Sequence, residues 1–151
     1  MCPIRWYHER GVGRLADQIQ SMVYPVMALY EALGGRFGDL SRPQLRLMMK
    51  LSGDPPTISA LADSLNISSP GVTQMIDKLQ NKGYVERHSQ ERDQRLVRVR
   101  MTDSGRAALA IAEAAFGDRV EQVLSPLSDQ ERDTLLEILD KLHLKSGPPA
   151  G

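Results

Sequence analysis

Apolar residues recur at helical spacing in the first part of the chain. Between about Gly13 and Leu33 they stand three and four positions apart, a pattern that predicts an amphipathic helix. The stripe consists of Leu15, Ile19, Met22, Val26, Tyr30 and Leu33. Pro25 lies inside it, and because a proline removes one backbone hydrogen bond, we expect it to kink or divide the helix. The pair Gly34-Gly35 marks the end.

Start and stop signals predict two more helices. Ser41 can cap a helix whose Gln44 reaches back to the cap, and Gly53-Asp54-Pro55-Pro56 stops that helix. Thr57 then caps a short helix over residues 58–65. The residues expected to point inward from this short helix are Leu61, Ala62 and Leu65.

A third short helix follows the tight turn Asn66-Ile67-Ser68. Ser68 or Ser69 can cap it, Pro70 suits its first turn, and Gly83 suits its C-terminal end. Residues at i, i+3, i+4 and i+7 predict its buried face, formed by Val72, Met75, Ile76 and Leu79. The predicted outer face carries Thr73, Gln74, Asp77 and Lys78.

Alternation then replaces helical spacing. Residues 84–88 and 96–101 are strand candidates, and in the second Val97, Val99 and Met101 alternate with Leu96, Arg98 and Arg100. The polar link 89–94 suits a hairpin tip. A short capped helix followed by a ribbon with an arginine at its tip is typical of a winged helix-turn-helix. The helix would enter the major groove of DNA, and the ribbon would reach the backbone and the minor groove.

Two helices are predicted after the ribbon. Thr102 caps an alanine-rich helix over about residues 103–124, and Pro126 ends it. Ser128 and Glu131 form a second capping box, which starts a final helix. The residues expected to point inward from the final helix are Leu135, Leu136, Leu139 and Leu142. Residues 146–151 are expected to be a disordered tail.

Composition agrees with a single domain. The chain has 151 residues, 41% of them hydrophobic and 25% charged, with no apolar run long enough to span a membrane. The N-terminal residues contain no apolar signal-peptide core, so we expect a cytoplasmic protein. The net charge is zero, but residues 36–101 hold eleven basic and seven acidic residues, a net +4, whereas residues 102–151 carry a net −4. A basic surface can therefore face phosphates, although ordinary charge fluctuation would give the same numbers.

The central motif resembles the MarR family of bacterial and archaeal transcription regulators, over about Leu15 to Leu142. The residues that carry the resemblance are Leu61-Ala62…Leu65-Asn66-Ile67-Ser68-Ser69-Pro70-Gly71-Val72-Thr73…Ile76-Asp77-Lys78-Leu79…Gly83-Tyr84-Val85-Glu86-Arg87, then Asp93-Gln94-Arg95…Val97-Arg98-Val99…Thr102-Asp103-Ser104-Gly105. The helix part alone is shared by many helix-turn-helix families. The Asp-x-Arg wing at this spacing, flanked by long terminal helices, makes the match specific.

The resemblance implies a fold that is mainly α with a small β-wing, and a homodimer that binds a near-palindromic site on double-stranded DNA. It places helical dimerisation regions at residues 1–36 and 102–145, and the winged helix-turn-helix at residues 37–101. It implies a regulator, most simply a repressor, with no enzymatic activity. Pro25 departs from the family pattern within the first helix.

Nine residues are candidates for DNA contact: Ser68, Ser69, Thr73, Gln74, Lys78, Arg92, Asp93, Arg95 and Arg98. A glutamine amide can pair bidentately with adenine, and a threonine methyl can touch thymine. Arg95 can enter a narrow minor groove. As in the family's motif, Asp93 is expected to hold the wing by pairing with Arg87 or Arg95. The alternatives are a solvated helix face and a plain surface ion pair.

Family members often bind small aromatic or lipophilic ligands. Tyr24, Tyr30, Phe37 and Met48 are the candidates here, with Met27, Met49 and Phe116 beside them, although such residues at helical spacing are more often core. Cys2 lies well before the first helix and has no base at fixed spacing that would lower its pKa. The histidines lack the spacing of metal ligands, so we expect no cofactor. The alternative function is a winged-helix module that binds protein without reading bases.

Overall fold

Two parts of the chain make up the described structure. The computed structural model describes residues 13–90 and 93–142, and its side-chain description leaves out residues 13–14, 89–90 and 93–96. The chain divides between Gly34 and Gly35 into an N-terminal unit and a larger second unit. None of the described helices is long and apolar enough to cross a membrane. Cys2, Arg92 and the expected tail 146–151 lie outside the described residues.

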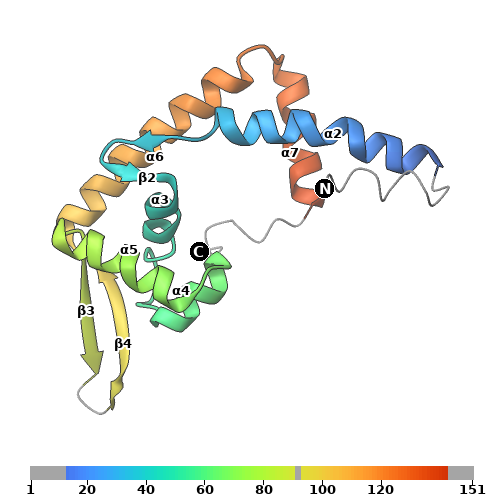
Figure 1. The fold of residues 1–151 in the computed structure, drawn as a ribbon. Helices are drawn as coiled ribbons and strands as arrows, with labels where there is room; N and C mark the ends of the chain where they lie inside the picture. The colour runs from blue at the N-terminus through green and yellow to red at the C-terminus, as the bar shows by residue number, and fades with distance from the viewer. Residues whose placement is uncertain (1–12, 91–92, 143–151) are drawn as a thin grey trace. The chain divides into compact units, whose positions relative to one another are not determined.

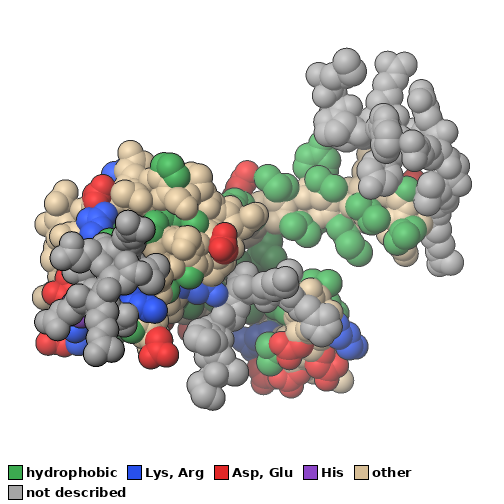
Figure 2. All heavy atoms as spheres, turned by 90° about the horizontal axis from the view of Figure 1, so that it is seen from below, with side chains coloured by type: hydrophobic (Ala, Val, Ile, Leu, Met, Phe, Trp, Pro, Cys, Tyr) green, Lys and Arg blue, Asp and Glu red, His purple; other side chains and the backbone are tan. Residues whose placement is uncertain are grey.

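The described part of the N-terminal unit consists mainly of helix α2, which runs over Gly13–Ala32 and passes through Pro25. Pro25 was expected to kink or divide this helix, and it does not divide it. Proline has a helical φ, so the turns on both sides continue although one hydrogen bond to the carbonyl four residues earlier is lost. The predicted apolar stripe is exposed over most of its length, as with Met22 at 61% and Tyr30 at 61%. Figure 2 shows these hydrophobic side chains standing on the surface.

The second unit begins with a small hairpin that the sequence patterns did not predict. Strands β1 (Arg36–Phe37) and β2 (Leu40–Ser41) pair antiparallel, and Gly38 turns between them with φ +56°. Strands of two residues are too short for alternation to be seen. The hairpin places Phe37 and Leu40 in the core, where the ring of Phe37 meets that of Phe116 edge-on at 5.2 Å.

Three helices follow as predicted, each beginning at its expected cap. Helix α3 covers Arg42–Met49, α4 covers Ile58–Leu65 and α5 covers Ser69–Asn81. The backbone N–H of Ser41 donates to Gln44 Oε1 at 3.0 Å, and that of Ala60 donates to Thr57 Oγ1 at 3.2 Å. These bonds satisfy amides that have no partner inside the helix.

The ribbon is longer than predicted. Strand β3 covers Val85–Gln90 and β4 covers Asp93–Met101, paired antiparallel with a register shift between Ser89 and Gln90. Backbone pairing therefore extends into the polar segment that the pattern assigned to the tip, because backbone hydrogen bonds do not require apolar side chains. The ribbon projects beyond helix α5 (Figure 1).

Two helices close the chain. Helix α6 covers Asp103–Leu124 and α7 covers Asp129–Lys141, and Thr102 and Ser128 cap them as predicted. Leu109 and Ala112 of α6 belong to the same buried cluster as α3, α4 and α5, so this helix is also part of the winged core. Of the four leucines of α7 expected to point inward, Leu135 is half-buried, whereas the expectation was wrong for Leu136, Leu139 and Leu142, which are 60, 41 and 58% exposed.

Candidate nucleic-acid interface

Helix α5 is anchored by its apolar face and by its ends. Val72, Ile76 and Leu79 are buried, and Met75 packs against them, as the spacing predicted. Of the two predicted caps it is Ser68 that serves, because its Oγ accepts from the N–H of Gly71 at 3.2 Å. The preceding helix ends at Asn66 in the left-handed region, φ 56°. The buried face of α5 and the short turn from α4 therefore hold α5 in a fixed orientation.

The opposite face of α5 is available for contact. Gln74 and Lys78 are exposed one turn apart, while Thr73 is half-buried. Ser69 is exposed at the start of the helix. A glutamine amide and an ammonium on one helix face match the groups that read base edges and bind phosphate. Gln74 and Lys78 are therefore exposed as the sequence predicted, whereas Thr73 is more buried than predicted.

The ribbon is joined to the start of α4. Arg98 Nη1 donates to the carbonyl of Pro55 at 2.7 Å, and the N–H of Val99 donates to that of Pro56 at 3.0 Å. Thr57 also forms a β-bridge with Arg98. Arg98, predicted to contact the DNA backbone, is thus half-buried and bound within the protein, and its contact with phosphate stays a prediction. The bonds fix the base of the wing to the helix-turn-helix.

The tip of the ribbon carries the remaining candidates. Asp93 and Arg95 lie in β4, but their side chains are outside the described ones, and Arg92 lies outside the described residues altogether. Their roles stay predictions. Arg87, which with Arg95 was a predicted partner of Asp93, donates to Asp77 Oδ1 and Gln80 Oε1 of α5, at 2.5 Å in each case. The pairing of Asp93 stays a prediction.

Helices α4 and α5 followed by the antiparallel ribbon of β3 and β4 form a winged helix-turn-helix. Residues 40–97 match the family model for the MarR family. The chain belongs to the MarR family. The match spans β2, α3, α4, α5, β3 and the first part of β4, which include the elements of the candidate interface.

Relatives of this MarR-family chain are transcription regulators. It is 27% identical over 126 residues to the HTH-type transcriptional regulator YdgJ of Bacillus subtilis, covering 81% of this chain and 77% of that protein. It is similar to the crystal structure of wild-type MarR from E. coli, with a TM-score of 0.64, 27% identity, and 69% and 78% of the two chains covered. Streptococcus pneumoniae FabT in complex with DNA matches with a TM-score of 0.59, 25% identity and 86% and 93% coverage.

The four ligand candidates divide between two environments. Phe37 and Met48 are 1% and 0% exposed in the core cluster, which favours the interpretation of these two as core residues. Tyr24 and Tyr30 are exposed on α2. A ligand role for the four stays a prediction. Among the described residues, no three His, Cys, Asp or Glu side chains gather into a group that could hold a metal ion.

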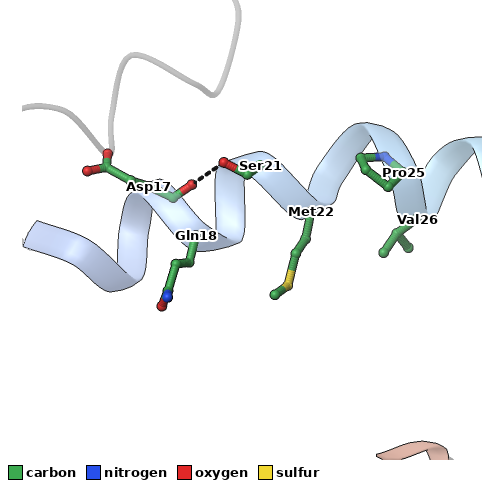
Figure 3. A pocket seen from close by; sticks show the side chains of 6 residues that line it. All are labelled: Asp17, Gln18, Ser21, Met22, Pro25 and Val26. Carbon is green, nitrogen blue, oxygen red and sulfur yellow. Dashed lines mark hydrogen bonds between the residues drawn. The ribbon is translucent and has the colours of Figure 1, made fainter. Parts of the chain in front are cut away.

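Helix α2 carries a shallow pocket of its own. Six residues of this one helix line it: Asp17, Gln18, Ser21, Met22, Pro25 and Val26. Gln18 and Met22 extend from the same side of the helix, and Ser21 Oγ donates to the carbonyl of Asp17 at 2.8 Å (Figure 3). None of the four predicted ligand residues lines this pocket.

A charged cluster at the far end of α5 was not predicted. Asp39, in the β1–β2 turn, accepts from Lys82 Nζ at 2.8 Å, from the Tyr84 hydroxyl at 3.0 Å and from Arg36 Nη2 at 3.3 Å. Lys82 and Tyr84 lie 43 and 45 positions from Asp39 along the chain, so no local pattern could pair them with it. The cluster ties the hairpin to the junction of α5 and β3.

The bonds from Lys82 and Tyr84 hold the pKa of Asp39 below its ordinary value of 3.8. Because the folded pKa is depressed, the stability linked to Asp39 is fully present above the ordinary value and is lost as the pH falls through the lowered one. Lys82→Met should move the pKa of Asp39 back up toward its ordinary value, measured by NMR titration of the carboxyl carbon. Lys141→Gln removes the same charge from α7 and should leave it in place. An Asp39 that titrates alike in all three proteins would contradict the assignment.

Proposed function

We propose that the protein is a homodimeric transcription regulator that recognises a near-palindromic operator and represses transcription until a small-molecule ligand releases it. The observation that carries the proposal is the outer face of α5. It presents Gln74 and Lys78 on a helix whose opposite face is buried in the core. That helix lies beside a ribbon fixed to the same core by the Pro55 and Pro56 carbonyls.

The chemistry of the face suits base reading. Gln74 would pair with an adenine edge and the methyl group of Thr73 would touch a thymine methyl. Lys78, with Ser68 and Ser69 at the start of the helix, would bind phosphates. At the wing Arg95 would enter the minor groove, with Asp93 holding the ribbon and Arg92 and Arg98 near the backbone. The similarity to FabT, whose structure was solved in complex with DNA, supports DNA as the partner.

Exposed apolar side chains support the dimer. On α2 they include Leu15, Ile19 and Met22, and on α7 they include Leu136, Ile138 and Leu139. Large exposed apolar patches on a protein of this size mark interaction sites. A second copy of the chain is the partner that would cover both helices, and a twofold dimer would place its two α5 helices about 34 Å apart, one DNA turn.

A ligand could release the protein from DNA by changing the distance between the two α5 helices of the dimer. A small aromatic or lipophilic molecule that binds one arrangement of the dimer more tightly shifts the population toward it. If this arrangement places the two α5 helices at the wrong distance, operator affinity falls. Tyr24 and Tyr30, exposed on α2, are the candidates for contact with such a ligand. We also propose a cytoplasmic location, where the DNA lies.

Selection of bound sequences from random DNA tests the proposal directly. We expect an inverted repeat, bound with nanomolar affinity that weakens steeply with salt because counterions are released from the phosphates. Analytical ultracentrifugation of the purified protein should give a dimer. A protein that binds no DNA at any salt concentration would favour the alternative, a winged-helix module that binds another protein.

Arg95→Ala should weaken binding to the selected operator by roughly tenfold, since a minor-groove arginine contributes on the order of 1–3 kcal/mol. The dimer should remain intact, because Arg95 lies in the ribbon. Arg132→Ala, which removes the same charge from α7, is the matched control and should bind the operator as the wild type does. Fluorescence anisotropy at fixed salt measures both variants. Equal operator affinity in Arg95→Ala and wild type would refute the wing contact.

A further inference from the structure

The side chain of Arg87 reaches from strand β3 to two residues of α5. Its Nη2 donates to Asp77 Oδ1 and its Nη1 to Gln80 Oε1, both at 2.5 Å. Asp77 and Gln80 stand one helical turn apart, so the two ends of one planar guanidinium hold successive turns of the same helix. The contact joins the second helix of the helix-turn-helix to the first strand of the wing.

This contact adjoins the proposed reading face. Asp77 follows Gln74 by three positions and therefore lies on the same side of α5. Strand β3 pairs through its backbone with β4, which carries Arg95. A fork with two bonds restrains the rotation of the helix about its own axis as well as its distance from the strand. Arg87 thus couples the positions of the two elements that would touch DNA.

The same contact contributes little to stability. The Arg87 side chain is 29% exposed and that of Asp77 is 55% exposed, and ion pairs in such places stabilise folded proteins only weakly. The core beneath α5 already holds the helix through Val72, Ile76 and Leu79. These core contacts still allow small rotations of α5 about its own axis. Recognition of base edges depends on the orientation of the outer face, which such rotations would change.

We propose that Arg87 is a positioning residue: through Asp77 and Gln80 it fixes the orientation of α5 relative to the wing, and thereby sets the discrimination between operator and random DNA. The inference rests on the proposed function. It differs from a contact of Arg87 with phosphate, in which only its charge would matter. It also differs from the pairing of Arg87 with Asp93 that the family motif suggests.

Arg87→Lys separates position from charge. Lysine keeps the positive charge but has no planar fork, so it cannot hold both partners in the same geometry. We expect the ratio of operator affinity to random-DNA affinity to fall about tenfold, with random-DNA affinity unchanged. If Arg87 acted only as a charge near phosphate, lysine would preserve the ratio. Urea unfolding of the variant should match that of the wild type.

Asp77→Ala distinguishes the two explanations by its effect on the ratio of operator affinity to random-DNA affinity. Removing an acid beside DNA would by charge alone tighten binding to every sequence. Positioning predicts instead that the ratio falls, as in Arg87→Lys. Asp63→Ala, which removes an exposed acid from α4, is the matched control for charge and should keep the ratio.

Double variants decide which partner matters. If Asp77 acts through the arginine, Asp77→Ala should change the ratio little once Arg87→Met is present. A full additional loss would mean that Asp77 itself contacts a base, and would overturn the proposal. Coupling of Arg87 to Asp93 rather than to Asp77 would overturn it as well.

The wild-type affinities for operator and random DNA show whether a negative result concerns the proposed function or only the role of Arg87. If the wild-type protein does not distinguish the selected operator from random DNA, the proposed function fails and the inference fails with it. If the wild type distinguishes them while Arg87→Lys and Asp77→Ala keep its ratio, the proposed function stands and the positioning role alone is refuted.

Discussion

Gly105→Ala should destabilise the protein by about 1–3 kcal/mol, because the new methyl group has no room. A Cβ at this position would lie 2.0 Å from the carbonyl oxygen of Tyr84 and 2.8 Å from Cγ of Met101. The clash with Tyr84 is with backbone, so a change of rotamer cannot relieve it. The first turn of α6 would have to move away from the start of the ribbon.

Two hydrogen bonds resist that movement. The N–H of Thr102 donates to the Tyr84 carbonyl at 3.0 Å, and Thr102 Oγ1 donates to the carbonyl of Gly83 at 2.6 Å. Thr102 Oγ1 also accepts from the N–H of Gly105 at 3.0 Å, which caps α6. Relief of the clash would therefore weaken the cap and the join between α6 and the ribbon together. Urea unfolding followed by circular dichroism measures the loss.

Gly117→Ala is the matched control in the same helix. A Cβ at Gly117 meets nothing within 4 Å, and alanine is the better helix former. This variant should gain about 0.5–1 kcal/mol, so the two glycines of α6 should respond with opposite sign. A gain at both positions would show that helix propensity, and not the close approach to Tyr84, governs Gly105.

Gln74→Ala should lower affinity for the selected operator by roughly ten- to a hundredfold, since a good bidentate contact with a base contributes about 1–3 kcal/mol. Gln74 is exposed on the outer face of α5, and its removal leaves the buried face untouched. The fold should therefore keep its stability. Because glutamine is uncharged, the dependence of binding on salt should not change.

The pattern of loss identifies the contact. In Gln74→Ala the preference should relax at one base pair in each half-site, while affinity for random DNA stays the same. Lys78→Ala should instead weaken binding to all sequences and reduce the salt slope by about 1. Gln122→Ala removes an exposed glutamine from α6 and serves as the control. A uniform loss across sequences in Gln74→Ala would exclude base reading by this residue.

Much of the helix-turn-helix follows from the sequence because its signals are local. Ser68, Thr57 and Thr102 each cap an amide three residues ahead, and Gly83 ends α5 with φ +75°. The buried face of α5 repeats every three or four residues. Such relations join neighbours in the chain, so they are visible in a pattern.

Other features depended on long-range contacts and were missed or mistaken. The small hairpin around Gly38 has no period, and Asp39 finds Lys82 forty-three residues away. Arg87 binds Gln80 and Asp77, seven and ten positions earlier on α5, a contact between a strand and a helix that no short-range pattern indicates. Pro25 does not divide α2, since the helix continues past one missing backbone hydrogen bond.

The sequence by itself determined the helices, their caps, the ribbon and the family, since these depend on periodicity and on short-range hydrogen bonds. It also placed Gln74 and Lys78 on the outer face of α5. Only the tertiary structure decided that Gly105 lies against the Tyr84 carbonyl, that α6 completes the winged core and that Arg87 joins α5 to the wing. Those outcomes depend on which surfaces pack together in three dimensions, and the spacing of residues along the chain does not specify that packing.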